Sequence, residues 1–198
     1  MKLAVISLKG GVGKSTTACH LAYFLSSKGP TLACDGDLNR SLTNWNERGQ
    51  GLPFRLVSEK QSPKYWNEYQ HAVVDTNARP SKEDIEDLAD ICDLLIVVTA
   101  CDALALDVLM PTAESLRAVG VEKFKVLLNQ VPPVGRAGED ARAAIVAAGL
   151  PVFRHQVRRY AAFQKAALAG VTVDRVTGDA HAADGWADFQ GVGRELLK

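Results

Sequence analysis

The stretch SLKGGVGKSTT (residues 7–17) lies between an apolar run at residues 2–8 and a helical pattern that starts at Lys14. A strand, a glycine-rich loop and a helix in that order predict a loop that cradles phosphate groups. Its glycines let the backbone turn tightly and point N–H groups at an anion, and the start of the helix adds a partial positive charge. Lys14 then stands where it can contact the β and γ phosphates, and the Ser15 hydroxyl can join a Mg²⁺ shell.

This loop departs from the ordinary phosphate-loop pattern at its beginning. The pattern G-x-x-x-x-G-K-[ST] requires glycine at position 8, where this chain has Leu8. The loop also carries a second lysine, Lys9, although Lys14 already occupies the position of the phosphate-binding lysine. The plain alternative for Lys9 is an exposed lysine at the end of a strand.

The rest of the chain alternates short apolar runs with helical stretches. Runs rich in Val, Leu and Ile predict strands at 31–35, 54–57, 71–75, 94–99 and 125–129. Helical patterns follow Lys14 and recur at 81–91, 104–119, 138–148, 158–169 and 184–197, and residues 41–49 are predicted to form a short helix or turn. This alternation predicts an α/β fold, with a mostly parallel sheet covered by helices on both faces, in a single domain over residues 1–198.

Four polar residues stand where predicted strands end: Asp35, Asp75, Thr99 and Asn129. In parallel sheets of this type, ligands bind beyond the carboxyl ends of the strands. We therefore expect these side chains to line one crevice with the glycine-rich loop.

The composition of the 198 residues is that of an ordinary globular protein, with 47% hydrophobic and 23% charged residues. Lysine plus arginine equals aspartate plus glutamate, at 23 each, so any affinity for nucleic acid must come from a local patch. The four cysteines have no C-x-x-C spacing and are interpreted as reduced thiols of a cytoplasmic protein. No apolar run reaches the ~18 residues of a membrane-spanning helix.

The motif KGGVGKST (residues 9–16) resembles the deviant Walker A motif of the ParA/MinD group of P-loop ATPases. The resemblance extends along most of the chain and is strongest to the short ParA type. Further segments that resemble family landmarks are CDGDLNRSLTNW (34–45), HAVVDTNARP (71–80), LLIVVTACDALALD (94–107) and VLLNQV (126–131).

The resemblance implies a P-loop NTPase that binds ATP with Mg²⁺ and hydrolyses ATP slowly. It implies that two ATP-bound monomers pack face to face, with Lys9 reaching the phosphates of the partner. Asp37, the second acid of a D-x-D motif, would position or activate the attacking water. Asp75 would be the Walker B acid, Asp35 would support the metal or the switch, and Asn129 would contact adenine.

The residues assigned to the site form three overlapping groups. They are Lys9, Lys14 and Asp37 for catalysis; Lys9, Gly10, Gly11, Val12, Gly13, Lys14, Ser15, Thr16 and Asn129 for nucleotide binding; and Ser15, Asp35 and Asp75 for the metal.

Purely structural roles are the alternatives for three of these residues. Asp35 and Asp37 are also suited to cap the following helix, because aspartate is a favoured helix cap. Asn129 is alternatively a plain asparagine that ends a strand. The family usually has proline and glutamine after D-x-D, and this chain has Leu38 and Asn39.

Charge is unevenly distributed along the chain. Residues 75–107 are rich in acids, whereas residues 151–175 are basic. ParA-type proteins bind DNA without sequence preference as ATP-bound dimers, and Lys and Arg contacts to phosphates suffice for that. The residues expected to bind DNA are Arg154, Arg158, Arg159 and Lys165, and a solvated charged helix face is the alternative.

Together these features indicate a ParA-type ATPase that partitions plasmid or chromosomal DNA. In this interpretation the ATP-bound homodimer binds nucleoid DNA, and a ParB-like or other adaptor protein stimulates hydrolysis and releases it. The alternatives are a positioning ATPase for a protein cargo, a MinD-like membrane-cycling regulator and a metabolic ATP-dependent enzyme. The membrane alternative is disfavoured because the tail at 183–198 lacks the lysine-rich polar face of interfacial helices.

Overall fold

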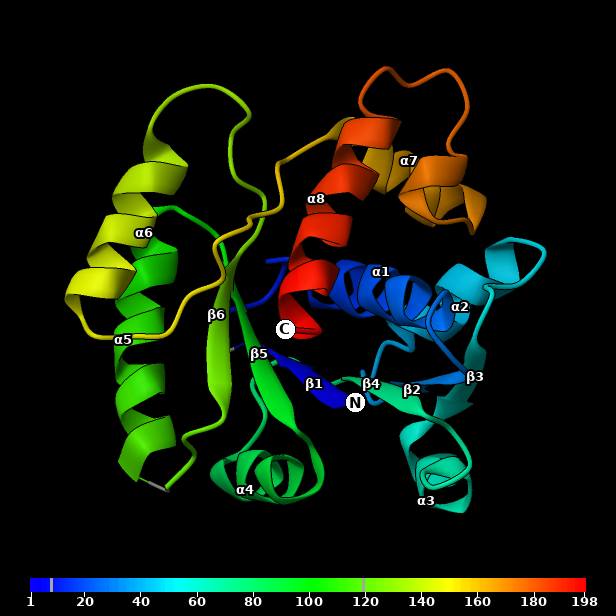
Figure 1. Cartoon of the computed structure of the whole chain (residues 1–198), viewed down its shortest axis with the longest axis horizontal. Coiled ribbons are helices and arrows are strands. Elements are labelled where there is room, and N and C mark those ends of the chain that lie inside the picture. Colours follow the sequence, from blue (N-terminus) through cyan, green and yellow to red (C-terminus); the bar gives the residue numbers. More distant parts are fainter. Residues whose placement is uncertain (8, 119) are drawn as a thin grey trace.

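A six-stranded parallel sheet forms the centre of the molecule, in the order β3-β2-β4-β1-β5-β6 (Figure 1). The computed structural model describes residues 1–7, 9–118 and 120–198. The strands are β1 (Lys2–Ile6), β2 (Thr31–Asp35), β3 (Arg55–Ser58), β4 (His71–Asp75), β5 (Leu94–Thr99) and β6 (Phe124–Leu128).

Helices connect these strands. They are α1 (Lys14–Ser26), α2 (Ser41–Arg48), α3 (Ser62–Tyr65), α4 (Lys82–Ile91), α5 (Ala103–Ala118), α6 (Ala137–Ala147), α7 (Ala161–Ala169) and α8 (Ala182–Leu196), with short 3₁₀ turns η1 (Glu59–Gln61) and η2 (Val173–Arg175). The predicted α/β fold with helices on both faces of a parallel sheet is confirmed.

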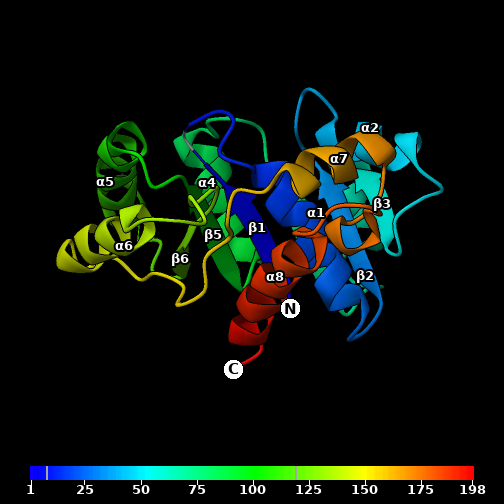
Figure 2. The same cartoon turned by 90° about the horizontal axis from the view of Figure 1, so that it is seen from above.

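Each face of the sheet has its own core because side chains alternate along a strand. In β1, Leu3 and Val5 pack with α1, α2, α7 and α8, whereas Ala4 and Ile6 pack with α4, α5 and α6. Figure 2 shows β6, with α5 and α6, at one edge of the sheet and β3 at the other. β1 lies between β4 and β5, so the loop that follows it opens at the middle of the carboxyl edge.

Most predicted boundaries hold to within a few residues. Two ends of predicted elements, Leu8 and Val119, lie outside the described residues. The turn η1 and the short helix α3, between β3 and β4, were not predicted.

The helix predicted from residue 158 begins only at Ala161. Residues 151–159 instead run beside β6 and its continuation as an irregular extension of the sheet. Five backbone hydrogen bonds hold this extension: Val126 N–H to Pro151 O (2.8 Å), Phe153 N–H to Val126 O (2.9 Å), Val157 N–H to Leu128 O (2.9 Å), Val131 N–H to Val157 O (3.0 Å) and Arg159 N–H to Val131 O (2.8 Å). Residues 158–160, which were predicted as the start of this helix, therefore precede it in this irregular segment.

The C-terminal helix α8 packs on the sheet, as expected, and buries its apolar side chains in the core. Phe189, Val192 and Leu196 are buried in the core that includes α1. At Gly193 a Cβ atom would collide with the ring of Phe24 on α1, and at Gly191 with the ring of His155. The glycines of this helix thus allow close packing. None of the helices in the described part of the chain combines the length and hydropathy that a bilayer crossing requires.

Candidate functional site

The glycine-rich loop ends at the first turn of α1, and no described side chain caps the backbone N–H groups of that turn. Gly13 is the N-cap and brings no side chain to fill the position, and no acidic residue stands in the first turn. The first N–H groups of a helix have no partner within the helix, and they favour an anion. Lys14, Ser15 and Thr16 form this turn and remain partly exposed. The residues present therefore fit a bound phosphate chain.

Two amide side chains from the end of β6 hold the loop from the side. The Asn129 Nδ2 group donates to Val12 O at 2.7 Å, and the Gln130 Nε2 group donates to Gly11 O at 2.7 Å. Gly13 has φ of 90°, and any Cβ there would collide with the Asn129 amide. Glycine is therefore required at position 13. The Asn129 position was predicted from its strand end, whereas Gln130 was not predicted.

The Asp75 carboxylate lies at the end of β4, directly beside β1, and is fully buried. Among the described residues, neither of its oxygens has a partner with hydrogen-bond geometry. Burial raises its pKa to about 7, although the Ser15 hydroxyl and Lys14 oppose that shift. An unpartnered buried carboxylate is costly unless a cation joins it. Asp75 therefore fits the predicted Mg²⁺ site.

Asp35 is the register partner of Asp75 on the neighbouring strand β2. Its Oδ2 atom accepts hydrogen bonds from the Thr43 N–H at 2.8 Å and the Thr43 hydroxyl at 2.6 Å, and so caps α2. The structure thus shows the capping role that was the alternative for Asp35. Across the described ranges, no group of three or more His, Cys, Asp or Glu side chains is arranged around a metal position.

The Asp37 carboxylate is engaged within its own loop. Oδ1 accepts from the Asn39 N–H at 3.2 Å, and Oδ2 accepts from the Ser41 hydroxyl. These contacts lie on the side of the loop that leads into α2.

Lys9 is paired within its own chain. Its ammonium group lies 2.9 Å from Oδ1 of Asp102, in the loop after β5, and the side chains are 35% and 52% exposed. The ion pair lowers the pKa of Asp102. Asp102 also accepts a hydrogen bond from the Ala105 N–H at the start of α5. Lys9 is therefore held at the edge of the loop by a residue of its own chain.

A pocket of about 230 Å³, here called the loop-side pocket, opens beside the first turn of α1. Its walls are Gly13 and Thr16 from the loop, the amides Asn129 and Gln130, and residues from 158–167. The mixture of amide, guanidinium and aromatic side chains suits a planar nitrogenous base. The 158–167 wall is 28 or more residues away in sequence from the other walls, so no local motif could have predicted it.

Within the described ranges, three loops at the carboxyl edge contain a non-glycine residue in the left-handed region. They are Arg40 with φ of 53°, Arg79 with φ of 63° and Gln130 with φ of 54°. Such conformations are uncommon and concentrate at functional sites. Their positions after β2, β4 and β6 mark the same edge as the glycine-rich loop.

The expected DNA-binding residues do not all present free charges. The Arg158 guanidinium forms a two-point ion pair with Asp188, and the Lys165 ammonium lies 2.8 Å from Asp179. Arg154 and Arg159 are exposed, and Arg159 lines the loop-side pocket. Arg158 is thus turned toward α8 and the nucleotide edge, which weakens its assignment to a DNA surface.

Comparison with known proteins decides the family. A model described as the CobQ/CobB/MinD/ParA nucleotide binding domain matches residues 3–173. The chain belongs to this family. Within it, the chain is a nucleotide-binding ATPase of the ParA/MinD type, as the sequence motifs indicated.

One curated relative aligns with almost the whole of this chain. "Maintenance of carboxysome distribution protein A" from Gloeobacter kilaueensis is 33% identical over 202 aligned residues, covering 98% of this chain and 93% of the relative. Two solved structures share the fold. A putative plasmid partition protein from Borrelia burgdorferi bound to AMPPNP has a TM-score of 0.76 at 15% identity, covering 99% and 98% of the two chains. A McdA variant from Cyanothece in complex with ATP has a TM-score of 0.73 at 16% identity, covering 99% and 96%.

Proposed function

We propose that this chain is a ParA-type positioning ATPase that distributes a protein cargo over nucleoid DNA. The arrangement that supports nucleotide chemistry is the uncapped first turn of α1 with Lys14, opposite the unpartnered Asp75 carboxylate. The preference for a protein cargo over DNA partition rests on the relative named for carboxysome distribution, which aligns along 98% of this chain. This proposal adopts the alternative from the sequence and sets plasmid or chromosome partition second.

In the proposed reaction cycle, the α1 turn and Lys14 hold the β and γ phosphates of ATP. Ser15, Asp75 and, in a supporting role, Asp35 hold Mg²⁺, which when bound neutralises charge on the phosphate oxygens. Asn129 and the walls of the loop-side pocket contact the base. Asp37 positions the attacking water once it leaves its loop partners.

Dimer formation places Lys9 on the phosphates of the second subunit in this proposal. Lys9 leaves Asp102 when the partner's γ-phosphate offers a stronger anion. The ATP-bound dimer then binds DNA without sequence preference, because a dimer doubles the phosphate contacts. A partner protein stimulates hydrolysis and returns the chain to monomers.

The proposed cycle is tested by co-sedimentation of the purified chain with non-specific DNA and with liposomes, each with ATP, ADP or no nucleotide. We expect sedimentation with DNA only in the presence of ATP. The Asp37→Ala variant should bind ATP normally, remain dimeric and stay on DNA, because the attacking water is no longer positioned. Binding to liposomes in place of DNA would favour the membrane-cycling alternative and overturn the proposal.

The cargo is tested by deleting the gene in its host. For a protein cargo, we expect clustered and unevenly inherited protein assemblies in fluorescence microscopy, while plasmids are retained through growth without selection. Loss of a plasmid with unchanged protein assemblies would favour DNA partition instead.

A further inference from the structure

One face of α8 presents three polar side chains to the extended 154–160 segment. They are His181 at the N-cap of the helix, Asp188 and Glu195, spaced seven residues apart. Residues at this spacing lie on one face of a helix, two turns from each other. Each contacts a different part of the 154–160 segment, which thus lies between β6 and this face.

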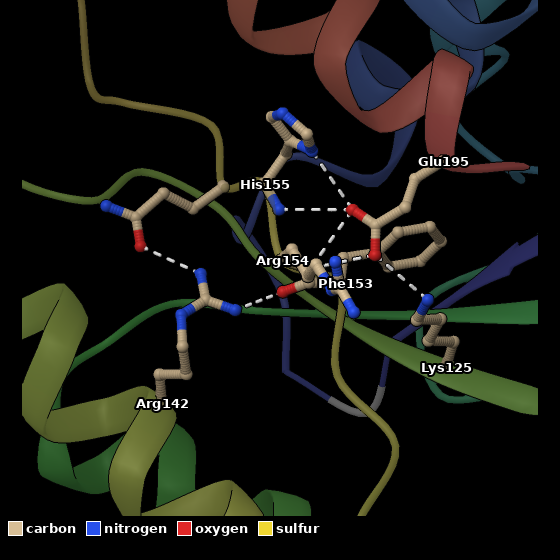
Figure 3. A network of polar contacts seen from close by, with 7 residues as sticks. Lys125, Arg142, Phe153, Arg154, His155 and Glu195 are labelled. Carbon is tan, nitrogen blue, oxygen red and sulfur yellow. Dashed lines mark hydrogen bonds and ion pairs between the residues drawn. The ribbon is translucent and has the colours of Figure 1, made fainter.

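Glu195 binds the start of the segment (Figure 3). Its carboxylate accepts the backbone N–H groups of Arg154 at 2.9 Å and His155 at 3.2 Å, and it contacts the His155 ring and the Lys125 ammonium at 3.0 Å each. The Glu195 side chain is only 10% exposed. Charge-assisted contacts of this kind fix a segment more firmly than neutral ones.

Asp188 binds the middle of the segment in the same manner. Its Oδ2 atom accepts the backbone N–H of Arg158 at 3.0 Å. The Arg158 guanidinium adds three contacts, from Nη2 to Oδ1 at 2.8 Å and from Nε to Oδ2 at 3.0 Å and to Oδ1 at 3.2 Å. The Asp188 side chain is 12% exposed and that of Arg158 is 33% exposed. A paired, planar guanidinium of this kind has one preferred orientation.

Arg158 is also one of the residues that line the loop-side pocket. The guanidinium lies 5.1 Å from the centre of the Tyr160 ring, and Tyr160 also lines the pocket. The Tyr160 ring stacks on His181 with 4.7 Å between ring centroids. Two pocket residues are therefore held by α8 and its N-cap: Arg158 by Asp188, and Tyr160 by His181.

We propose that Asp188 is a positioning residue for nucleotide binding: it holds Arg158 against the nucleoside part of ATP in the loop-side pocket. The inference rests on the proposed function, which places the base in that pocket. It makes α8 part of the nucleotide-binding apparatus, although the helix does not itself line the pocket in the described structure. Without Asp188, the partly exposed Arg158 side chain would be free to turn into solvent.

The experiment compares ATP with a ligand that lacks the nucleoside. Asp188→Asn keeps the shape of the side chain and removes the charge that pairs with the guanidinium. We expect a fluorescent ATP analogue to bind roughly tenfold more weakly to this variant, because charge-assisted contacts near the base are lost. Inorganic tripolyphosphate, which occupies only the glycine-rich loop, should compete with parent affinity. A merely structural role for Asp188 would not separate the two ligands.

Asp179→Asn is the matched control. Asp179 is a similarly buried aspartate, 9% exposed, that pairs with Lys165 and does not line the pocket. We expect both ligands to bind this control as they bind the parent. If Asp188→Asn lowers the melting temperature too far for binding studies, Arg158→Gln removes the guanidinium itself and should show the same selective loss.

Two results would overturn the inference. One is a folded Asp188→Asn or Arg158→Gln variant with parent affinity for the ATP analogue. The other is an equal loss for tripolyphosphate and the analogue. A parent protein that binds neither ligand would overturn the proposed function together with this inference, so the two failures are distinguishable.

Discussion

Replacing Lys9 with alanine tests whether this lysine serves its own subunit or the partner. The pair with Asp102 joins two side chains that are 35% and 52% exposed. Exposed pairs of this kind contribute about 0–1 kcal/mol to stability. The Lys9→Ala monomer should therefore unfold at nearly the parent free energy, and it should bind ATP with parent affinity because Lys14 and the α1 turn remain.

The dimer should respond very differently. A charge-assisted contact from Lys9 to a phosphate contributes roughly 1.5–3 kcal/mol, and a symmetric dimer loses two of them. Each subunit gives up its pair with Asp102 to make that contact, at a cost of up to about 1 kcal/mol. The net loss on mutation is then about 3 kcal/mol, or about a hundredfold in the dimer dissociation constant.

Sedimentation velocity in ATP and Mg²⁺ measures this loss, with both proteins in an Asp37→Ala background so that hydrolysis does not obscure it. Asp102→Asn is the control, because it removes the same ion pair and keeps Lys9. It should leave dimerisation at least as strong as in the parent. A Lys9→Ala dimer of parent stability would refute the reasoning, and so would a loss of ATP binding by the monomer.

Three further outcomes follow from the site and from α8. Lys14→Ala should abolish binding of a fluorescent ATP analogue, because the phosphates lose their cation; near-parent affinity would contradict the role given to the glycine-rich loop. Asp75→Asn should raise the melting temperature of the nucleotide-free protein at pH 8 and change it little at pH 5. The reason is that burial raises the pKa of Asp75 from 3.8 to about 7, so keeping this carboxylate ionised in the folded protein at high pH costs on the order of 4 kcal/mol. This destabilisation of the folded parent grows as the pH rises from 3.8 to about 7. Equal melting temperatures of the parent and Asp75→Asn at pH 8 would contradict this account. Burial alone would raise the pKa of Glu195, but its N–H, His155 and Lys125 partners lower it to about 2, so its contribution to stability is full above about pH 4.5 and falls as pH drops toward 2. The difference in unfolding free energy between parent and Glu195→Gln, from urea titrations, should therefore be largest near neutral pH and narrow in acid, and a constant difference would contradict this account.

The strands and the glycine-rich loop were predictable because their signals are local. A buried parallel strand is a short apolar run, and the loop is one continuous motif. The segment at 151–159 was mistaken in part for helix because its structure depends on backbone bonds to β6, more than 20 residues earlier. Once paired there, residues 158–160 cannot join the helix that begins at Ala161.

The site residues also divide into those with a local sequence signal and those whose partners are distant in sequence. Lys14, Asp75 and Asn129 stand at strand ends or in the motif, so their common edge followed from the alternation of strands and helices. Asp102 and Asp188 contact their partners across 93 and 30 residues of chain, and no spacing rule connects such positions. Arg158 was assigned to DNA binding from the distribution of charge along the sequence, and that distribution does not show that Arg158 pairs with Asp188.

The two chain ends lie close together, near the amino ends of the strands (Figure 1). The Met1 amine donates to Gln70 O at 2.9 Å, whereas Lys198 follows the end of α8 and is exposed. A fluorescent protein joined after Lys198 would therefore sit across the sheet from the nucleotide edge and leave the Met1 contact intact. In a face-to-face dimer the two labels would point to opposite poles. Energy transfer between them would then be weak even on full dimerisation, so weak transfer between such labels would not show that the chain is monomeric.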